Sequence, residues 1–268
     1  MKKPLALILM TLLLMSVTQA ANDIKLRYST QNQPSKFSVK QSMVIGEKGE
    51  NHFSRDFSFD VSTAEQQKPE SILLTINKAR ASFSAHGQKM RQQTSHMISQ
   101  SVALTVSSDG LRILPPSEKK DQAVNVQLVE AGFPVGRAFS ELLPILPNKA
   151  INIGSRWTSE KKVHSLEGWS WLEGTIANQH TVTSIEQKHG STLISVETLS
   201  KGNLVATAQS RKYQGEEALT QKSNWVFDAT HGRLISLSVE QKTKGRSEVP
   251  QGMVIVAQTT QFNLSTGE

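Results

Sequence analysis

The sequence has no cysteine, and this excludes disulfides, thiolate metal sites, cysteine nucleophiles and the lipidated cysteine of a bacterial lipoprotein. It also lacks a Gly-x-Ser-x-Gly serine elbow, a His-Glu-x-x-His motif and a phosphate-binding glycine loop. The folded chain must therefore be stabilised by packing alone. We predict no catalytic residues, no metal site and no cofactor.

Charge of one sign is only slightly in excess, with 30 lysines and arginines against 23 acids and a net charge of +7. Lys2 and Lys3 contribute two of these charges, and the other basic residues are scattered among acids. A nucleic-acid surface needs a continuous basic stripe with interleaved aromatic residues, which is not present. We therefore expect no nucleic-acid partner. The mild basicity fits weak attraction to anionic envelope lipids or polysaccharides as well as it fits plain solubility.

The one long apolar run stands at the beginning of the chain. Lys2 and Lys3 precede the apolar run from Leu5 to Val17, and Thr18-Gln19-Ala20 is a small-residue end suited to cleavage. This run is shorter than the ~20 residues of a membrane-spanning helix, so a signal peptide (1–20) is favoured over a membrane anchor. We expect export to the periplasm, no transmembrane segment after cleavage, and no lipid attachment.

Apolar residues alternate with polar ones through most of residues 21–116, which is typical of strands with one wet face. Ile72, Leu74 and Ile76 share one parity, and Ala79 and Ala81 share the other. Either a β-bulge near residues 77–78 or a break between two short strands explains the change. The polar stretch 86–100 fits a short amphipathic helix or an ordered loop.

The period changes in residues 117–150. Phe139, Leu142, Leu143 and Leu146 recur at spacings of three and four, which predicts a short helix at 137–146 that Pro144 and Pro147 bring to an end. Alternation then returns from 151 onward, with hairpin turns expected at 188–191 and 228–232. Long strands fill the rest.

These patterns predict a mainly β (β-rich α+β) fold: a strongly curved antiparallel sheet or half-barrel with short helices packed on its concave face. We expect residues 21–268 to be a single β-rich domain. Its two β regions, 21–116 and 151–268, would be joined by the helical segment 117–150.

Two short segments carry a resemblance to known proteins. Leu146-Pro147 with the stretch Ile151–Trp157, and the later Phe227-Asp228-x-x-x-Gly232-Arg233-Leu234, look like a pattern shared by uncharacterised bacterial envelope proteins. The expected shape also resembles the LolA/LppX half-barrel proteins, in which a bent sheet wraps helices around an apolar cavity. That resemblance implies a role in carrying or sensing a lipid or another apolar ligand. The missing lipobox cysteine departs from many members of that group.

Polar residues suggest little chemistry. The seven histidines are dispersed, and His189-Gly190-Ser191 reads as a hairpin turn rather than part of a hydrolase site. Glu173 and Asp228 lie near tryptophans, a combination that sugar-binding sites also use. Two such carboxylates meet only in the folded chain, and the sequence pattern does not show whether they do. A hydrolase is therefore our third hypothesis.

The candidate ligand pocket is apolar. Its residues would form either a filled core or the wall of a cavity, and they are Phe139, Leu142, Leu143, Leu146, Trp157, Trp225 and Phe227. Our first hypothesis is a periplasmic, non-enzymatic binding or carrier protein for a lipid or other apolar ligand. The alternative is an envelope assembly or interaction protein that acts through a protein partner.

Overall fold

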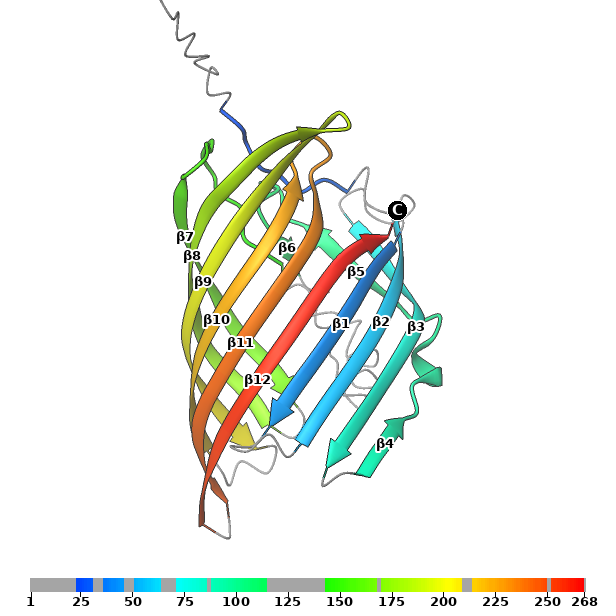
Figure 1. Ribbon diagram of the computed structural model, residues 1–268, viewed down its shortest axis with the longest axis vertical. Coiled ribbons are helices and arrows are strands. Elements are labelled where there is room, and N and C mark those ends of the chain that lie inside the picture. The colour runs from blue at the N-terminus through cyan, green and yellow to red at the C-terminus, as the bar shows by residue number, and fades with distance from the viewer. Residues whose placement is uncertain are drawn as a thin grey trace, which may run out of the picture.

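A computed structural model describes residues 23–30, 36–45, 51–63, 71–85, 88–114, 143–167, 170–208, 214–249 and 252–267. Most of these residues lie in strands (Figure 1). The strands are β1 (Lys36–Ile45), β2 (Asn51–Thr63), β3 (Ser71–Ala85), β4 (Gln88–Gln92), β5 (Ser101–Val106), β6 (Ile113–Leu114), β7 (Arg156–Glu167), β8 (Ser170–Lys188), β9 (Ser191–Ala208), β10 (Gln214–Asp228), β11 (Arg233–Val249) and β12 (Gly252–Gly267).

All strands belong to one curved antiparallel sheet, with the order β6-β5-β3-β2-β1-β12-β11-β10-β9-β8-β7 and β4 beside β3. β1 pairs with β2 on one side and with β12 on the other, so the first and last strands are neighbours. The two β regions expected from the sequence therefore form a single sheet. The sheet is not closed, and the predicted curved antiparallel architecture is confirmed (Figure 1).

Strict alternation gives the sheet an inner and an outer face. Along β10, Ser223, Trp225 and Phe227 are buried, while Lys222 and Asn224, which alternate with them, are exposed. Side chains of a strand point alternately to opposite faces, so the buried set defines the inner face of the sheet. The same parity holds in β9, where Ile194, Val196 and Thr198 are buried.

A β-bulge explains the change of parity in β3. Ser58 pairs with Lys78 and Phe59 pairs with Ile76, which leaves Asn77 as an extra residue in β3. Because the extra residue shifts the alternation by one, Ile76 and Ala79 both reach the inner face. Of the two explanations for this segment, the bulge is correct and the break is not.

The described residues contain little of the helix that the sequence predicts. The predicted helix at 137–146 is wrong in its last turn: residues 143–150 form no helix, and residues 115–142 lie outside the described ranges. Within those ranges the structure has one helical turn, the 3₁₀ turn η1 (Ser95–Met97), which follows β4 in the segment where a helix or a loop was expected. Short helices on the inner face are thus not seen in the described residues.

Side chains explain why 143–147 stays irregular, because they bind the carbonyls that a helix would use. Lys161 Nζ donates to the carbonyl of Leu143 at 2.6 Å, and the Tyr28 hydroxyl to that of Pro144 at 2.9 Å. Trp157 Nε1 donates to the Ile145 carbonyl at 3.1 Å. Prolines at 144 and 147 also lack the N–H donors of a helical ladder.

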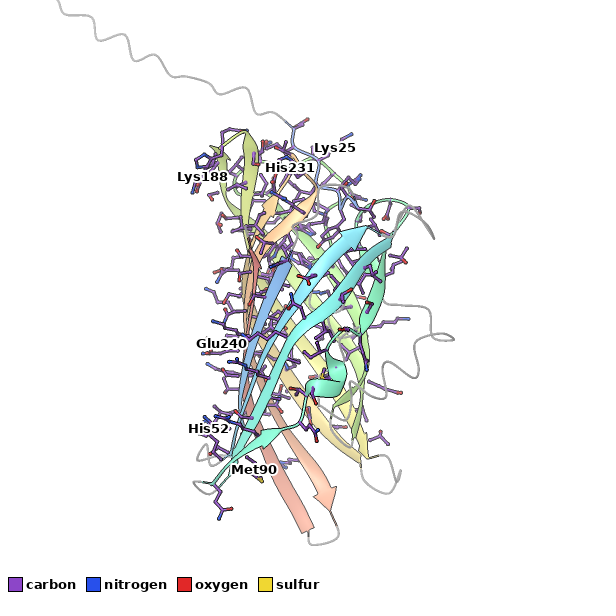
Figure 2. The ribbon with its side chains drawn as sticks, turned by 90° about the vertical axis from the view of Figure 1, so that its right-hand side faces the viewer. Lys25, His52, Met90, Lys188, His231 and Glu240 are labelled. Carbon is purple, nitrogen blue, oxygen red and sulfur yellow. The ribbon has the colours of Figure 1, made fainter. Side chains whose placement is uncertain are left out.

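One end of the sheet, which we call the capped end, is crossed by residues 23–30. Tyr28 N donates to the Gly110 carbonyl at 2.7 Å, and Ser29 N donates to the Gly232 carbonyl at 2.8 Å. Ile24 forms an isolated bridge with Ile151. Figure 2 shows Lys25, Lys188 and His231 at this end and His52 and Met90 at the opposite end.

The main hydrophobic core lies on the inner face and reaches the capped end. It joins both halves of the sheet to residues 23–30 and 143–151, and includes Leu26, Tyr28, Val39, Leu74, Ile76, Met97, Leu104, Ile151, Val196, Trp225, Phe227, Leu237, Phe262 and Leu264. Residues far apart in the chain thus share one core.

We predict that Gly232→Ala destabilises the protein more than Gly190→Ala does. Both glycines have positive φ, 67° and 80°, where an L residue costs about 1–2 kcal/mol. A Cβ on Gly232 would also lie 2.7 Å from the Arg27 carbonyl oxygen, whereas one on Gly190 meets nothing within 4 Å. Overpacking adds roughly 1–3 kcal/mol at Gly232 alone.

The measurement is urea unfolding of both variants beside the wild type. Equal losses of unfolding free energy would show that residues 23–30 do not hold the capped end as described.

Candidate functional site

The structure brings the described members of the predicted pocket together. Leu143, Leu146, Trp225 and Phe227 belong to the main core and the partly buried Trp157 packs against it, whereas positions 139 and 142 lie outside the described residues. The rings of Trp157 and Trp225 meet edge to face at 6.1 Å between centroids. Near the capped end these side chains therefore pack against one another.

A buried histidine borders this aromatic cluster. His180, on β8, is 2% exposed and stacks on Trp157 with ring centroids 4.7 Å apart. Its Nδ1 lies 2.7 Å from Thr198 Oγ1, and its Nε2 lies 2.9 Å from Ser159 Oγ. Trp225 Nε1 donates to the same Thr198 hydroxyl at 2.9 Å. Indole and imidazole are thus joined through one threonine.

His180 is neutral at ordinary pH. Burial, and after it the positive charge of Lys161, lowers the pKa of His180 to about 4. A neutral imidazole has one donor and one acceptor nitrogen, and hydroxyls can satisfy both. With both nitrogens engaged by Ser159 and Thr198, the ring is held in one orientation on the inner face.

Next to His180, on the side away from the capped end, six uncharged polar residues line the inner face side by side. They are direct cross-strand neighbours on six consecutive strands. We call this set the polar row: Ser159 (β7), Asn178 (β8), Ser200 (β9), Gln221 (β10), Gln241 (β11) and Thr260 (β12). Asn178, Ser200 and Thr260 are 6%, 3% and 8% exposed, so hydrogen-bonding groups are buried on this face.

A second apolar cluster lies on the far side of the polar row from the capped end. Leu204 and Leu219, each 3% exposed, pack there with Val163 and Ile176. Glu217, two residues before Leu219 on β10, has the same parity, and burial raises the pKa of its carboxyl group. The inner face is therefore apolar, then polar, then apolar along the strands.

Ser191, His231 and Asp228 come close to one another near the capped end, but not as a catalytic triad. In a triad the serine and the acid use different nitrogens of the imidazole. Here Nδ1 of His231 lies 2.7 Å from Asp228 Oδ2 and 3.3 Å from Ser191 Oγ. Ser191 Oγ also donates to Asp228 Oδ2 at 3.1 Å.

Asp228 instead organises the turn between β10 and β11. Its Oδ1 accepts from the backbone N–H groups of Thr230 and His231 at 3.1 and 3.2 Å. Burial alone would raise the pKa of Asp228, but the hydrogen bonds from His231 and Ser191 outweigh it and the pKa is lowered. A charged carboxylate with several donors is a stable turn element.

Asp228 and Glu173 do not form a carboxylate pair. Their partners on β9, Leu193 and Val205, lie near opposite ends of that strand. At ~3.3 Å per residue the two acids are roughly 40 Å apart, whereas glycosidase carboxylates need to lie within about 10 Å. This pairing is thus excluded as a glycosidase site.

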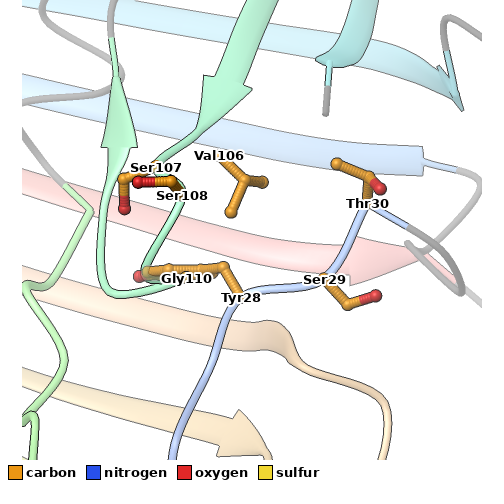
Figure 3. A pocket seen from close by; sticks show the side chains of 7 residues that line it. All are labelled: Tyr28, Ser29, Thr30, Val106, Ser107, Ser108 and Gly110. Atoms are coloured by element: carbon orange, nitrogen blue, oxygen red, sulfur yellow. The ribbon is translucent and has the colours of Figure 1, made fainter. Parts of the chain in front are cut away.

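A surface pocket of about 290 Å³ lies where residues 28–30 meet the turn between β5 and β6. Its lining is small and mostly polar: Tyr28, Ser29, Thr30, Val106, Ser107, Ser108 and Gly110 (Figure 3). The Tyr28 hydroxyl donates a hydrogen bond to the Pro144 carbonyl. The pocket is a junction between chain segments.

The described residues contain no group of three or more histidines and acids close enough to hold a metal ion. They contain no helix with both the length and the apolar character to cross a membrane.

Comparisons with known proteins add little. No family model matches the chain, and no curated protein matches it. Among solved structures the chain is similar to a loop L8 deletion mutant of OmpT, an outer membrane protein of Vibrio cholerae, at 6% identity over 86% of this chain and 97% of that chain. The TM-score is 0.19, too low for the similarity to carry an argument.

The polar row was not predicted from the sequence, because alternating apolar residues were the signal used for inward positions. A signal was present in β9, where Val196, Thr198, Ser200 and Leu204 keep one parity through polar positions. Parity shows which residues face inward even where the inward residue is polar.

We predict that burial of neutral His180 makes the protein less stable in acid. The unfolded chain has a histidine pKa near 6.5 and the folded chain one of about 4, so the unfolded state binds more protons between these values. The contribution of His180 to the free energy of unfolding is fully present above pH 6.5. It decreases by roughly 3 kcal/mol as the pH drops toward 4. Urea unfolding from pH 7.5 to 4 measures this loss.

His180→Gln is the control, because glutamine keeps a donor and an acceptor but does not titrate. The pH dependence that differs between wild type and variant belongs to His180. Identical pH profiles would contradict a buried neutral histidine.

Proposed function

We propose that this chain is a non-enzymatic binding or carrier protein that holds a lipid or another apolar ligand on the inner face of its sheet. The N-terminal 20 residues support export, and the periplasm is the proposed location. The proposal continues the expectation drawn from the resemblance to LolA/LppX half-barrel proteins, which stays a prediction.

The observation that carries the proposal is the second apolar cluster. Leu204 and Leu219 lie apart from the main core, across the polar row, on the inner face of an open sheet. Ligand sites are typically concave and apolar with a few placed polar groups. Because Leu204 and Leu219 are themselves only 3% exposed, the gain would come from the apolar area of the ligand, at about 25 cal/mol for each Å² removed from water.

A second candidate is an assembly or interaction protein, favoured by the edge of the sheet. β7 ends the strand order among the described residues, so its outer side offers backbone donors and acceptors to a partner strand. Leu199 and Val205 on β9 are also 50% and 43% exposed on the outer face. In this reading the partner is a protein and the inner face carries no ligand.

We predict that residues 21–268, purified from the periplasm without detergent, carry a discrete lipid. Native mass spectrometry would then show a complex heavier than the chain, and organic extraction would release the ligand. Leu219→Gln should reduce the bound fraction, because it places an amide in the second apolar cluster. Thr220→Gln, next to it on the exposed outer face, should leave the bound fraction unchanged.

Circular dichroism must show that both variants are folded. A ligand-free mass for the wild type, together with stoichiometric capture of one protein, would contradict the carrier proposal and favour the assembly protein.

A further inference from the structure

We propose that the polar row binds an uncharged, hydrogen-bonding headgroup of the ligand, such as the hydroxyls of a neutral lipid. This inference rests on the proposed function and adds the chemical class of the ligand. On this assignment the headgroup lies across the polar row while the hydrocarbon part lies along the second apolar cluster.

Ser200 is the residue that points to a ligand. It is 3% exposed, and among the described residues its hydroxyl has no hydrogen-bond partner. Buried polar groups are almost always paired, because an unpaired one loses its bonds to water without replacement. Thr198, two residues earlier on the same face, has two such partners. A ligand group would pair this hydroxyl in the middle of the polar row, for which the described residues supply no partner.

The neighbours of Ser200 can bind such a group from both sides. Asn178 on β8 and Gln221 on β10 are its direct cross-strand neighbours. Opposite residues of this kind have Cβ atoms about 5 Å apart, so one small polar group can contact more than one of these side chains. Asn178 donates one amide hydrogen to Ser159 at 3.2 Å, and its side chain has a second donor and a carbonyl oxygen.

The two glutamine amides at the β11–β12 end are oriented along their own strands. Gln241 Nε2 donates to Thr243 Oγ1 at 3.3 Å, and Gln258 Nε2 donates to Thr260 Oγ1 at 3.0 Å. An amide held in this way keeps its carbonyl oxygen as an acceptor. A ligand with hydroxyl or amide groups, which both donate and accept, suits this mixture.

The charges near the polar row favour a neutral headgroup over an anion. The row itself has no ionisable side chain, and His180 beside it is neutral at pH 7. Lys161, the nearby cation, donates to the Leu143 carbonyl at 2.6 Å. Glu217 lies on the other side, where its carboxylate would repel an anion once ionised.

Three probes with the same hydrocarbon chain separate the classes: 1-monopalmitoylglycerol, palmitate and hexadecane. Delipidated protein (21–268) is incubated with equimolar mixtures, and occupancy is read by native mass spectrometry. We expect monopalmitoylglycerol to occupy the protein at least about tenfold more than either competitor, as one or two added hydrogen bonds would give.

Substitution of Ser200 tests the residue itself. Ser200→Ala should lower the affinity for monopalmitoylglycerol about tenfold while thermal stability stays equal or rises, because the unpaired hydroxyl is removed. Ser238→Ala, on the exposed outer face of β11, should change neither. Gln221→Leu is a second variant, with the same expected loss of affinity.

The outcomes distinguish the two proposals. If all three probes bind equally, or palmitate binds best, or both polar-row variants bind monopalmitoylglycerol as the wild type does, the headgroup assignment is overturned while the carrier proposal stands. If no probe binds and the purified protein carries no lipid, both fall.

Discussion

The register of the antiparallel sheet is the constraint on which the rest of the structure depends. Each strand exposes one parity and buries the other, so a slip of one residue would exchange the inner and outer faces. Bulges at Asn77, Thr183 and Ile235 shift the parity locally without losing the inner face, which is why Leu234 and Leu237 are both buried. Because this register holds across β7–β12, six polar residues of distant sequence positions become neighbours.

An open curved sheet must also cover its inner face, and near the capped end the chain does so with itself. Residues 23–30 and 143–151 lie against the core, and their backbone groups find partners in turns and side chains. The carbonyls of Leu143, Pro144 and Ile145 accept from Lys161, Tyr28 and Trp157. This satisfies buried backbone that has no strand partner, which is the general condition for irregular chain inside a protein. Burial raises the pKa of Tyr28, so its hydroxyl stays a donor.

The candidate site combines aromatic residues that the sequence predicts with polar partners that it does not predict. Trp157, Trp225 and Phe227 are predicted for their apolar character and do come together: β8 and β9 separate their strands, and the curved inner face brings the rings of Trp157 and Trp225 within 6.1 Å. Their partners His180 and Thr198 could not be chosen from a pattern, because the contact depends on which residue of β9 faces β8. The same holds for Ser191, His231 and Asp228, whose residue types suggest a hydrolase while their atoms form a turn.

The sequence by itself determined the fold class, the strands with their alternating faces, and the hairpin turns at 188–191 and 228–232, where His189 and Gly190 have positive φ. These are local properties, since period and turn chemistry act over a few residues. Only the tertiary structure decided the pairing of β1 with β12, the irregular course of 143–150 and the continuity of the polar row. Each of these joins residues far apart in the chain. These features depend on cross-strand register and on hydrogen bonds from side chains to backbone carbonyls. A local sequence pattern encodes neither.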